Sequence, residues 1–109
     1  MNLVGLVGHV SRPPTVRCEG EGTPTASFTV VVSEVSREGK PYTTFMGCVA
    51  WGKNAERCRT LHAEDMVVLV GKLTWVKRQH ACGQDHSQLV VQVRELALVE
   101  AAAVEGGEG

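Results

Sequence analysis

Residues 43–56, TTFMGCVAWGKNAE, constrain the fold most strongly, because they indicate a strand that ends at Gly52 and turns directly into a helix. In an extended strand, successive side chains point to opposite faces. One face would carry two large rings separated by a glycine: Phe45, Gly47, Val49 and Trp51. The other face would be small and apolar, as a core-facing side should be: Met46, Cys48 and Ala50. Two interpretations stay open here, either exposed rings that stack on unpaired bases beside Lys53 or rings buried in the core.

The rest of the chain predicts an all-β domain with one helix. Apolar or alternating segments indicate five strands, at residues 3–10, 27–33, 43–52, 66–75 and 89–94. Residues 54–63 predict the helix, in which Ala55, Cys58 and Leu61 form a narrow apolar stripe. Three strands, a helix and two more strands is the order of the OB-fold, a five-stranded Greek-key barrel that typically binds oligonucleotides or oligosaccharides.

Length and composition indicate one folded domain. The chain has 109 residues, of which 43% are apolar and 21% charged, so it can bury a core. We expect the barrel to occupy residues 1–100 and residues 101–109 to be a frayed tail. All 11 lysines and arginines but only 8 of the 12 acidic residues lie in residues 1–94, which gives this part a charge of +3. That distribution permits a nucleic-acid partner without requiring one.

The chain shows no leader sequence and no apolar run long enough to span a membrane, so a cytoplasmic protein is expected. Its four cysteines lie far apart and predict free thiols rather than disulfides. His80, Cys82 and His86 resemble a partial zinc site in a hairpin loop, but without a fourth ligand nearby we predict neither metal nor cofactor. No catalytic arrangement is recognisable, and we predict that the protein is not an enzyme.

Several segments resemble the bacterial single-stranded DNA-binding proteins. The similar segments occur in the family's order across about residues 2–98: residues 1–8 (MNLVGLVG), Arg12 and Pro14, residues 27–30 (SFTV), residues 49–56 (VAWGKNAE) and residues 67–73 (VVLVGKL). The resemblance implies an OB-fold that assembles into dimers or tetramers. It also implies sequence-tolerant binding of single-stranded DNA in replication, recombination and repair.

Carried over by position, the resemblance assigns Phe45 and Trp51 to the base-stacking positions. It places Lys53, Lys72 and Arg78 along the path of the DNA. Other candidates for DNA contact lie in the loop that leads into residues 43–52 and at or just beyond the end of residues 66–75: Arg37, Lys40, Tyr42, Trp75 and Lys77. A first strand rich in valine and leucine is a poor edge to leave in water, so an oligomer interface is expected there. Its residues are Leu3, Val4, Leu6, Val7 and His9.

The chain departs from the family pattern in two respects that bear on function. Trp75 has the opposite strand parity from a DNA-facing aromatic, so we expect it in the core unless a β-bulge turns it outward. The family's acidic tip, Asp-Ile-Pro-Phe, which recruits other proteins, is absent, so the sequence is either truncated or that of a tail-less paralogue. The alternative function is therefore an OB-fold accessory or primosome-type protein that acts mainly through protein contacts.

Overall fold

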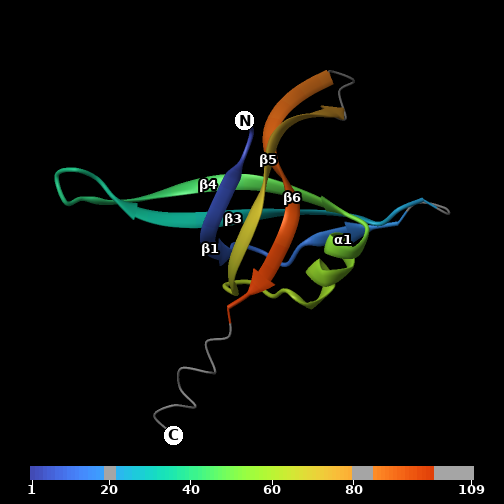
Figure 1. The fold of residues 1–109 in the computed structure, drawn as a ribbon, viewed down its shortest axis with the longest axis horizontal. Coiled ribbons are helices and arrows are strands. Elements are labelled where there is room, and N and C mark those ends of the chain that lie inside the picture. The colour runs from blue at the N-terminus through green and yellow to red at the C-terminus, as the bar shows by residue number, and fades with distance from the viewer. Residues whose placement is uncertain (19–21, 80–84, 100–109) are drawn as a thin grey trace, which may run out of the picture.

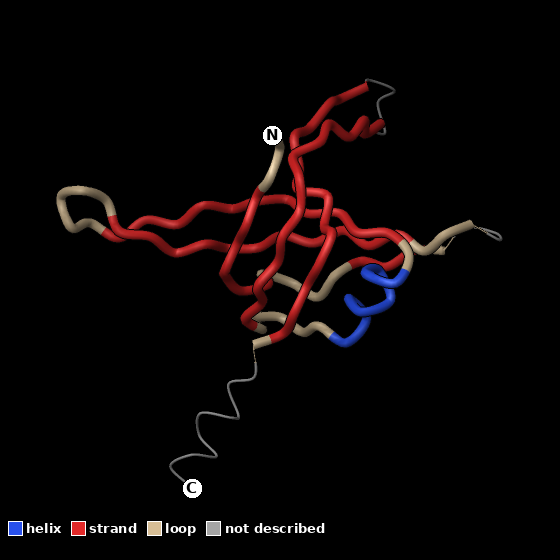
Figure 2. Tube along the Cα trace, viewed as in Figure 1, coloured by secondary structure: helices blue, strands red, loops and turns tan. Residues whose placement is uncertain are grey.

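A computed structural model describes residues 1–18, 22–79 and 85–99 of the chain (Figure 1). Most of these residues are in strands (Figure 2). In chain order the elements are β1 (Val4–Val10), β2 (Thr15–Arg17), β3 (Thr25–Val35), β4 (Pro41–Trp51), helix α1 (Lys53–Arg57), a 3-10 turn (Cys58–Thr60), β5 (Met66–Gln79) and β6 (Asp85–Leu98). The expected tail at residues 101–109 lies outside the described residues.

The sheet closes into a barrel, which confirms the predicted OB-fold. Its strand order is β1-β5-β6-β4-β3-β2, and β1 also pairs with β3 through His9 and Val10. Neighbouring strands are antiparallel except β4 and β6, which are parallel where they meet. Closure requires a glycine at position 8, because a Cβ there would overlap the carbonyl oxygen of Val31. Inward-facing apolar side chains from every barrel strand fill the interior, among them Val10, Phe28, Cys48, Leu69 and Val91.

The helix is shorter than predicted. The sequence predicts helix over residues 54–63, whereas α1 ends at Arg57 and continues only as the 3-10 turn to Thr60. The Thr60 hydroxyl donates a hydrogen bond of 2.9 Å to the carbonyl oxygen of Arg57, which occupies an acceptor that a longer helix would need. Leu61 is already extended, yet it and Cys58 still bury their side chains in the core. The apolar stripe therefore identified the buried residues correctly but not the conformation of the last turn.

A β-bulge in β6 shifts which residues face the core. Val70 pairs with Glu95 and Gly71 pairs with Val93, so Arg94 has no partner on β5. As a result Leu96 and Val93, three positions apart, both point into the barrel. Gly71 is required at this crossing, because a Cβ there would overlap the carbonyl oxygen of Gln92.

Two hairpins continue past the barrel as two-stranded ribbons, and this explains why the strands are longer than the sequence predicted. The β3–β4 arm consists of residues 32–44, and the β5–β6 arm of the described residues between 74 and 90. Figure 1 shows them leaving the barrel in different directions. Over these arms the strands have no third neighbour among the described residues. No helix in the described ranges is long and apolar enough to cross a membrane.

Candidate nucleic-acid interface

The outer surface of β3 and β4 carries both predicted rings, and we call it the ring face. Cross-strand pairs place its residues in rows: Thr25 beside Trp51, Ser27 beside Val49, Thr29 beside Gly47, and Val31 beside Phe45. Phe45 is 67% exposed and Trp51 42% exposed. The opposite side of β4 is the core, where Cys48 and Ala50 are buried. Of the two interpretations that the sequence left open, the structure therefore supports exposed rings.

A hollow separates the two rings. Gly47 lies between them on β4, and a Cβ at this position would contact the side chains of Val90 at 3.4 Å and Gln88 at 3.5 Å. A cavity of about 370 Å³ opens beside it and is lined mainly by polar groups, including Arg12, Ser27 and Thr29. Hydroxyls and an amide around an open space between two rings can accept the polar edges of bases. Arg12 and Gln88 were not predicted as site residues, because neither has a neighbouring aromatic in the sequence.

Cations border the ring face on both sides. Lys72 is exposed and pairs with Gln92, which in turn pairs with Val49, so Lys72 lies on this same surface. Lys53 is exposed where β4 turns into α1. Arg17 is also exposed. It pairs with Thr25, which pairs with Trp51, so all three lie in one row across the strands. The sequence did not predict Arg17 as a site residue. A strand of three residues is too short to show an alternating pattern, so no signal marked Arg17 in advance.

The other predicted basic residues lie further out. Arg37 and Lys40 are exposed in the turn of the β3–β4 arm, where Gly39 has a positive φ of 82°. Lys77 is exposed on the β5–β6 arm, on the side opposite the ring face. Arg78 lies in β5, outside the residues whose side chains the structure describes.

Trp75 is not in the core, so the sequence-based expectation was wrong. It pairs with Leu89, one rung beyond the pair Leu73 and Val91 that still packs against the core. Trp75 lies on the same side of β5 as the inward-facing Leu73, as predicted, and the bulge at Arg94, which is in β6, does not turn it to the other side. Trp75 is nevertheless 68% exposed, because the hairpin has already left the barrel at this rung and none of the described residues covers its inward side.

Tyr42 has the corresponding position on the β3–β4 arm. It has inward parity, opposite to Phe45, and its rung partner is Glu34. The negative charge of Glu34 and a hydrogen bond to it raise the pKa of Tyr42. Tyr42 and Trp75 therefore both lie on the side of their arms that faces away from the ring face, and they differ in their charged neighbours.

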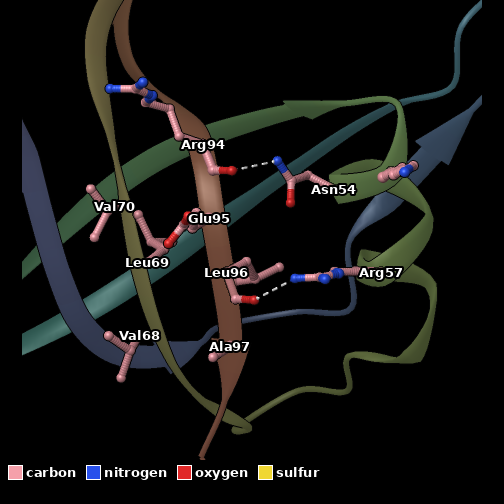
Figure 3. Close-up of a pocket in the computed structure, with 10 residues that line it drawn as sticks. Asn54, Arg57, Val68, Leu69, Val70, Arg94, Glu95, Leu96 and Ala97 are labelled. Atoms are coloured by element: carbon pink, nitrogen blue, oxygen red, sulfur yellow. Dashed lines mark hydrogen bonds between the residues drawn. The ribbon is translucent and has the colours of Figure 1, made fainter.

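A second cavity, of about 600 Å³, lies between α1 and the outer side of β5 and β6 (Figure 3). Lys53, Arg57 and Arg94 line it over an apolar floor that includes Val68 and Val70. This edge of β6 has no neighbouring strand in the described part of the chain, and two side chains of α1 bind its carbonyl oxygens instead. The amide of Asn54 donates to the carbonyl oxygen of Arg94 at 3.0 Å, and Arg57 donates to that of Leu96 at 3.2 Å. Arg57 thus has a structural role.

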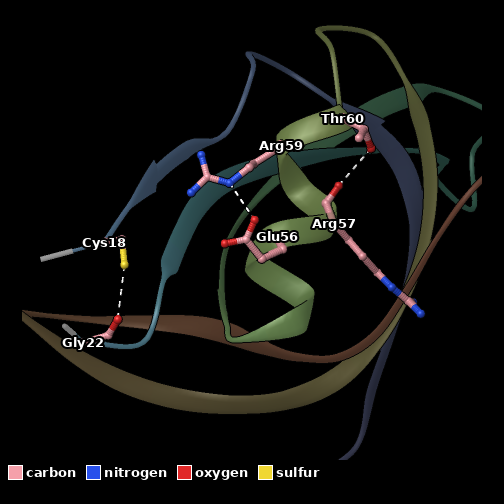
Figure 4. Close-up of polar contacts among 6 residues, drawn as sticks. All are labelled: Cys18, Gly22, Glu56, Arg57, Arg59 and Thr60. Carbon is pink, nitrogen blue, oxygen red and sulfur yellow. Dashed lines mark hydrogen bonds and ion pairs between the residues drawn. The ribbon is translucent and has the colours of Figure 1, made fainter. Parts of the chain in front are cut away.

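The opposite side of α1 is held by local polar contacts (Figure 4). Arg59 forms an ion pair of 2.8 Å with Glu56, and this hydrogen bond raises the pKa of Arg59. The Cys18 thiol donates to the carbonyl oxygen of Gly22 at 3.2 Å. Cys18 is an exposed free thiol, whereas burial raises the pKa of Cys48 to about 12 and that of Cys58 to about 11.

The predicted interface strand divides its side chains between two sides. Val4 and Leu6 pack against the core, whereas Leu3 and Val7 point outward. His9 is partly buried, and its Nε2 lies 3.8 Å from Oε1 of Glu64. With neighbouring residues of β5, the outward side chains form an exposed surface that we call the aliphatic face: Leu3, Val7, Met66, Val68 and Val70.

The edge of β1 opposite β5 has no neighbouring strand over residues 4–8, as far as the described residues show. A free edge next to an aliphatic surface is the kind of structure that a second copy can cover. The loop predicted to bind no zinc lies largely outside the described residues: positions 80–84 are not described, nor is the side chain of His86. Within the described part, no group of three or more possible metal ligands is present.

Comparison with known proteins agrees with this geometry. The model of the "Single-strand binding protein family" matches residues 1–99. A single-stranded DNA-binding protein of Thermotoga maritima is 36% identical over 73 residues, which are 63% of this chain and 52% of the relative. Another, from Caldanaerobacter subterraneus subsp. tengcongensis, is 32% identical over 81 residues, 69% of this chain and 54% of the relative.

A third relative, the single-stranded DNA-binding protein of Lactiplantibacillus plantarum, is 27% identical over 106 residues, which are 94% of this chain and 53% of the relative. The chain thus spans about half the length of these curated relatives.

Proposed function

The chain belongs to the single-strand binding protein family, and from this premise we propose that it binds single-stranded DNA without preference for base sequence. One observation carries the proposal: Phe45 and Trp51 are exposed on one face of one strand. They are six residues apart, which is about 20 Å along an extended strand. Rings at this spacing can stack on different bases of one strand, and stacking tolerates every base because each has a π-face.

Cations supply the other half of the proposed site. Lys53, Lys72 and Arg17 border the ring face, where they can neutralise phosphates as the bases stack. Arg78, Arg37 and Lys40 extend this set along the two hairpins. Each neutralised phosphate releases counterions, so affinity should fall steeply with salt. We propose a binding role with no catalytic step, in replication, recombination and repair and hence in the cytoplasm.

We also propose that the protein is a homodimer or a higher homo-oligomer. The free edge of β1 can pair with its copy about a two-fold axis and join two sheets. The aliphatic face next to this edge would then be covered, with Leu3 and Val7 contributed by each copy. Replication and repair proteins are further possible partners.

A titration with poly-dT at two salt concentrations tests the proposed function. Tryptophan fluorescence should be quenched by poly-dT and, with similar affinity, by a mixed-sequence strand, while duplex DNA should compete poorly. Affinity should fall at the higher salt concentration. The accessory-protein alternative, which the matches to relatives named for single-stranded DNA binding do not favour, predicts no quenching by any of these strands. That result would reject the proposal.

A further inference from the structure

The β5–β6 arm displays a tryptophan on the side facing away from the ring face. Along this hairpin, the ring-face positions are Lys72 and alternate residues beyond it, paired with Gln92, Val90 and Gln88. Trp75 and its partner Leu89 lie between these positions, so their side chains leave the opposite surface of the ribbon. A DNA strand lying on the ring face therefore cannot touch Trp75 unless it crosses the arm.

Nothing within the described residues covers this rung. The pairing of β1 with β5 stops at Gly71, and that of β4 with β6 begins only at Val91. Trp75 is 68% exposed and Leu89 42% exposed, side by side on a two-stranded ribbon. A tryptophan next to a leucine is a costly surface to leave in water, so its exposure points to a ligand with a flat apolar surface.

The neighbouring charge indicates what kind of ligand fits. Lys77 and Ser87 form the next rung on the same surface, and both are exposed. A ring, a cation and a hydroxyl together suit a base and its phosphate. The β3–β4 arm provides an internal comparison, because Tyr42 has the same parity but sits beside the carboxylate of Glu34. That negative charge would repel a phosphate, so an exposed ring on each arm does not imply the same function on both.

We propose that Trp75, Leu89 and Lys77 form a second contact surface for the same DNA strand, on the back of the β5–β6 arm. The strand leaves the ring face, passes over the arm and stacks a base on Trp75. DNA must therefore exceed a minimum length before it reaches Trp75. This inference rests on the proposed function.

The two tryptophans allow each surface to be observed separately. In the Trp75→Phe variant, fluorescence reports on Trp51, and in Trp51→Phe it reports on Trp75, with an aromatic ring kept at both sites. Each variant is titrated with dT of about 6 and about 30 nucleotides, below and above most site sizes known for OB-folds. Both lengths should quench Trp51. The long strand should quench Trp75 over the same concentration range, whereas the short strand should need at least about tenfold more DNA, since a single ring holds it.

Matched variants test the chemistry of the second surface. Lys77→Gln should weaken quenching of Trp75 by the long strand and leave quenching of Trp51 by the short strand unchanged. Thr44→Ala, at an exposed position on the same side of the other arm as Tyr42, should change neither. Quenching of Trp51 without any quenching of Trp75 would overturn the inference and leave the proposed function intact. If neither tryptophan is quenched and labelled dT is not retained on a filter, the proposed function itself fails.

Two further outcomes would also overturn the inference. If the short strand quenches both tryptophans at the same concentration, Trp75 is not part of a second surface that only longer DNA can reach. If Trp75→Ala lowers the mass measured by light scattering, the rung is a contact between protein copies. The expected result is an unchanged mass.

Discussion

The ring face and the aliphatic face lie on the outside of the same barrel, and both expose apolar side chains, yet they differ in composition. On the ring face, two aromatic rings stand among hydroxyl-bearing residues such as Ser27 and Thr29. On the aliphatic face, Val7, Val68 and their neighbours form a group with no ring among them. Apolar exposure alone therefore does not identify a partner.

What differs is how each surface can be covered. Rings separated by polar groups can each take a flat base while the phosphates remain in water. Adjacent branched side chains are covered well only by another apolar surface of matching shape. We therefore propose DNA as the partner of the ring face and a second copy of the chain as the partner of the aliphatic face, and variants on each face can test this difference.

The largest effect is expected from Val68→Glu on the aliphatic face. A carboxylate buried between two copies without a partner is strongly unfavourable, so the oligomer should dissociate to the monomer mass of 11.7 kDa. Multi-angle light scattering at micromolar concentration measures this. Thr29→Glu is the matched control on the ring face, and it should keep the oligomer mass while weakening poly-dT binding. A parent protein that is already monomeric would contradict the assignment of the aliphatic face.

Removing either ring should produce the next largest effect. Trp51→Ala and Phe45→Ala should each cost about 1–3 kcal/mol of binding free energy per stacked base, with the salt dependence nearly unchanged. Competition against a labelled dT strand at several salt concentrations measures both quantities. Thermal melting must first show that the variants fold like the parent. Val7→Ala, on the aliphatic face, should leave DNA affinity unchanged. If this variant lost as much binding free energy as Trp51→Ala, the two faces would not differ in DNA binding.

A smaller effect is expected from the cations beside the rings. Lys72→Ala should reduce the slope of log affinity against log salt by about 0.7, the value for one phosphate contact on a single strand. Arg59→Ala is the control, because Arg59 already forms an ion pair with Glu56 on the far side of α1. Its slope should stay close to that of the parent. An equal change of slope in both variants would mean that the overall charge of the protein, and not the position of a cation beside the rings, sets the salt dependence.

The smallest effect concerns the core behind the ring face. Burial raises the pKa of Cys48 to about 12 and of Cys58 to about 11, so both remain protonated and unreactive at pH 8. In a Cys82→Ser background, iodoacetamide should modify Cys18 alone, as read by mass spectrometry, without changing poly-dT affinity. Rapid modification of Cys48 would show that the barrel opens beneath the rings.

Much of this architecture could be predicted from alternation alone. The pattern around Phe45 and Trp51 predicted that both rings share one side of β4 and that the small apolar residues face the core, but it left open whether the rings are exposed. The order of the five longer strands along the chain and the position of the helix were predicted from similar patterns, whereas β2 was not predicted. Burial supplied the signal in each case.

The sequence misled where a strand leaves the barrel. The alternation of β5 predicted correctly to which side Trp75 points. Whether that side is covered depends on where β1 and β4 stop pairing with the hairpin, and the sequence around Trp75 carries no information on this. Arg17 was missed because β2 is too short to show a period. Leu61 was assigned to a helix because its spacing from Cys58 fits a helix, although an extended residue buries the same side chain.

The unpaired Arg94 makes β6 tolerant of the loss of one particular codon. Loss of this one codon would remove the bulge and bring the two halves of β6 into a single alternation. Val93 and Leu96 would then be two positions apart, so both would still face the core and each surface of β6 would keep its side chains. A three-base deletion here would therefore shorten the strand without exchanging its surfaces, whereas loss of one residue from the regularly paired stretch 87–90 would turn the side chains on one side of the deletion to the opposite face.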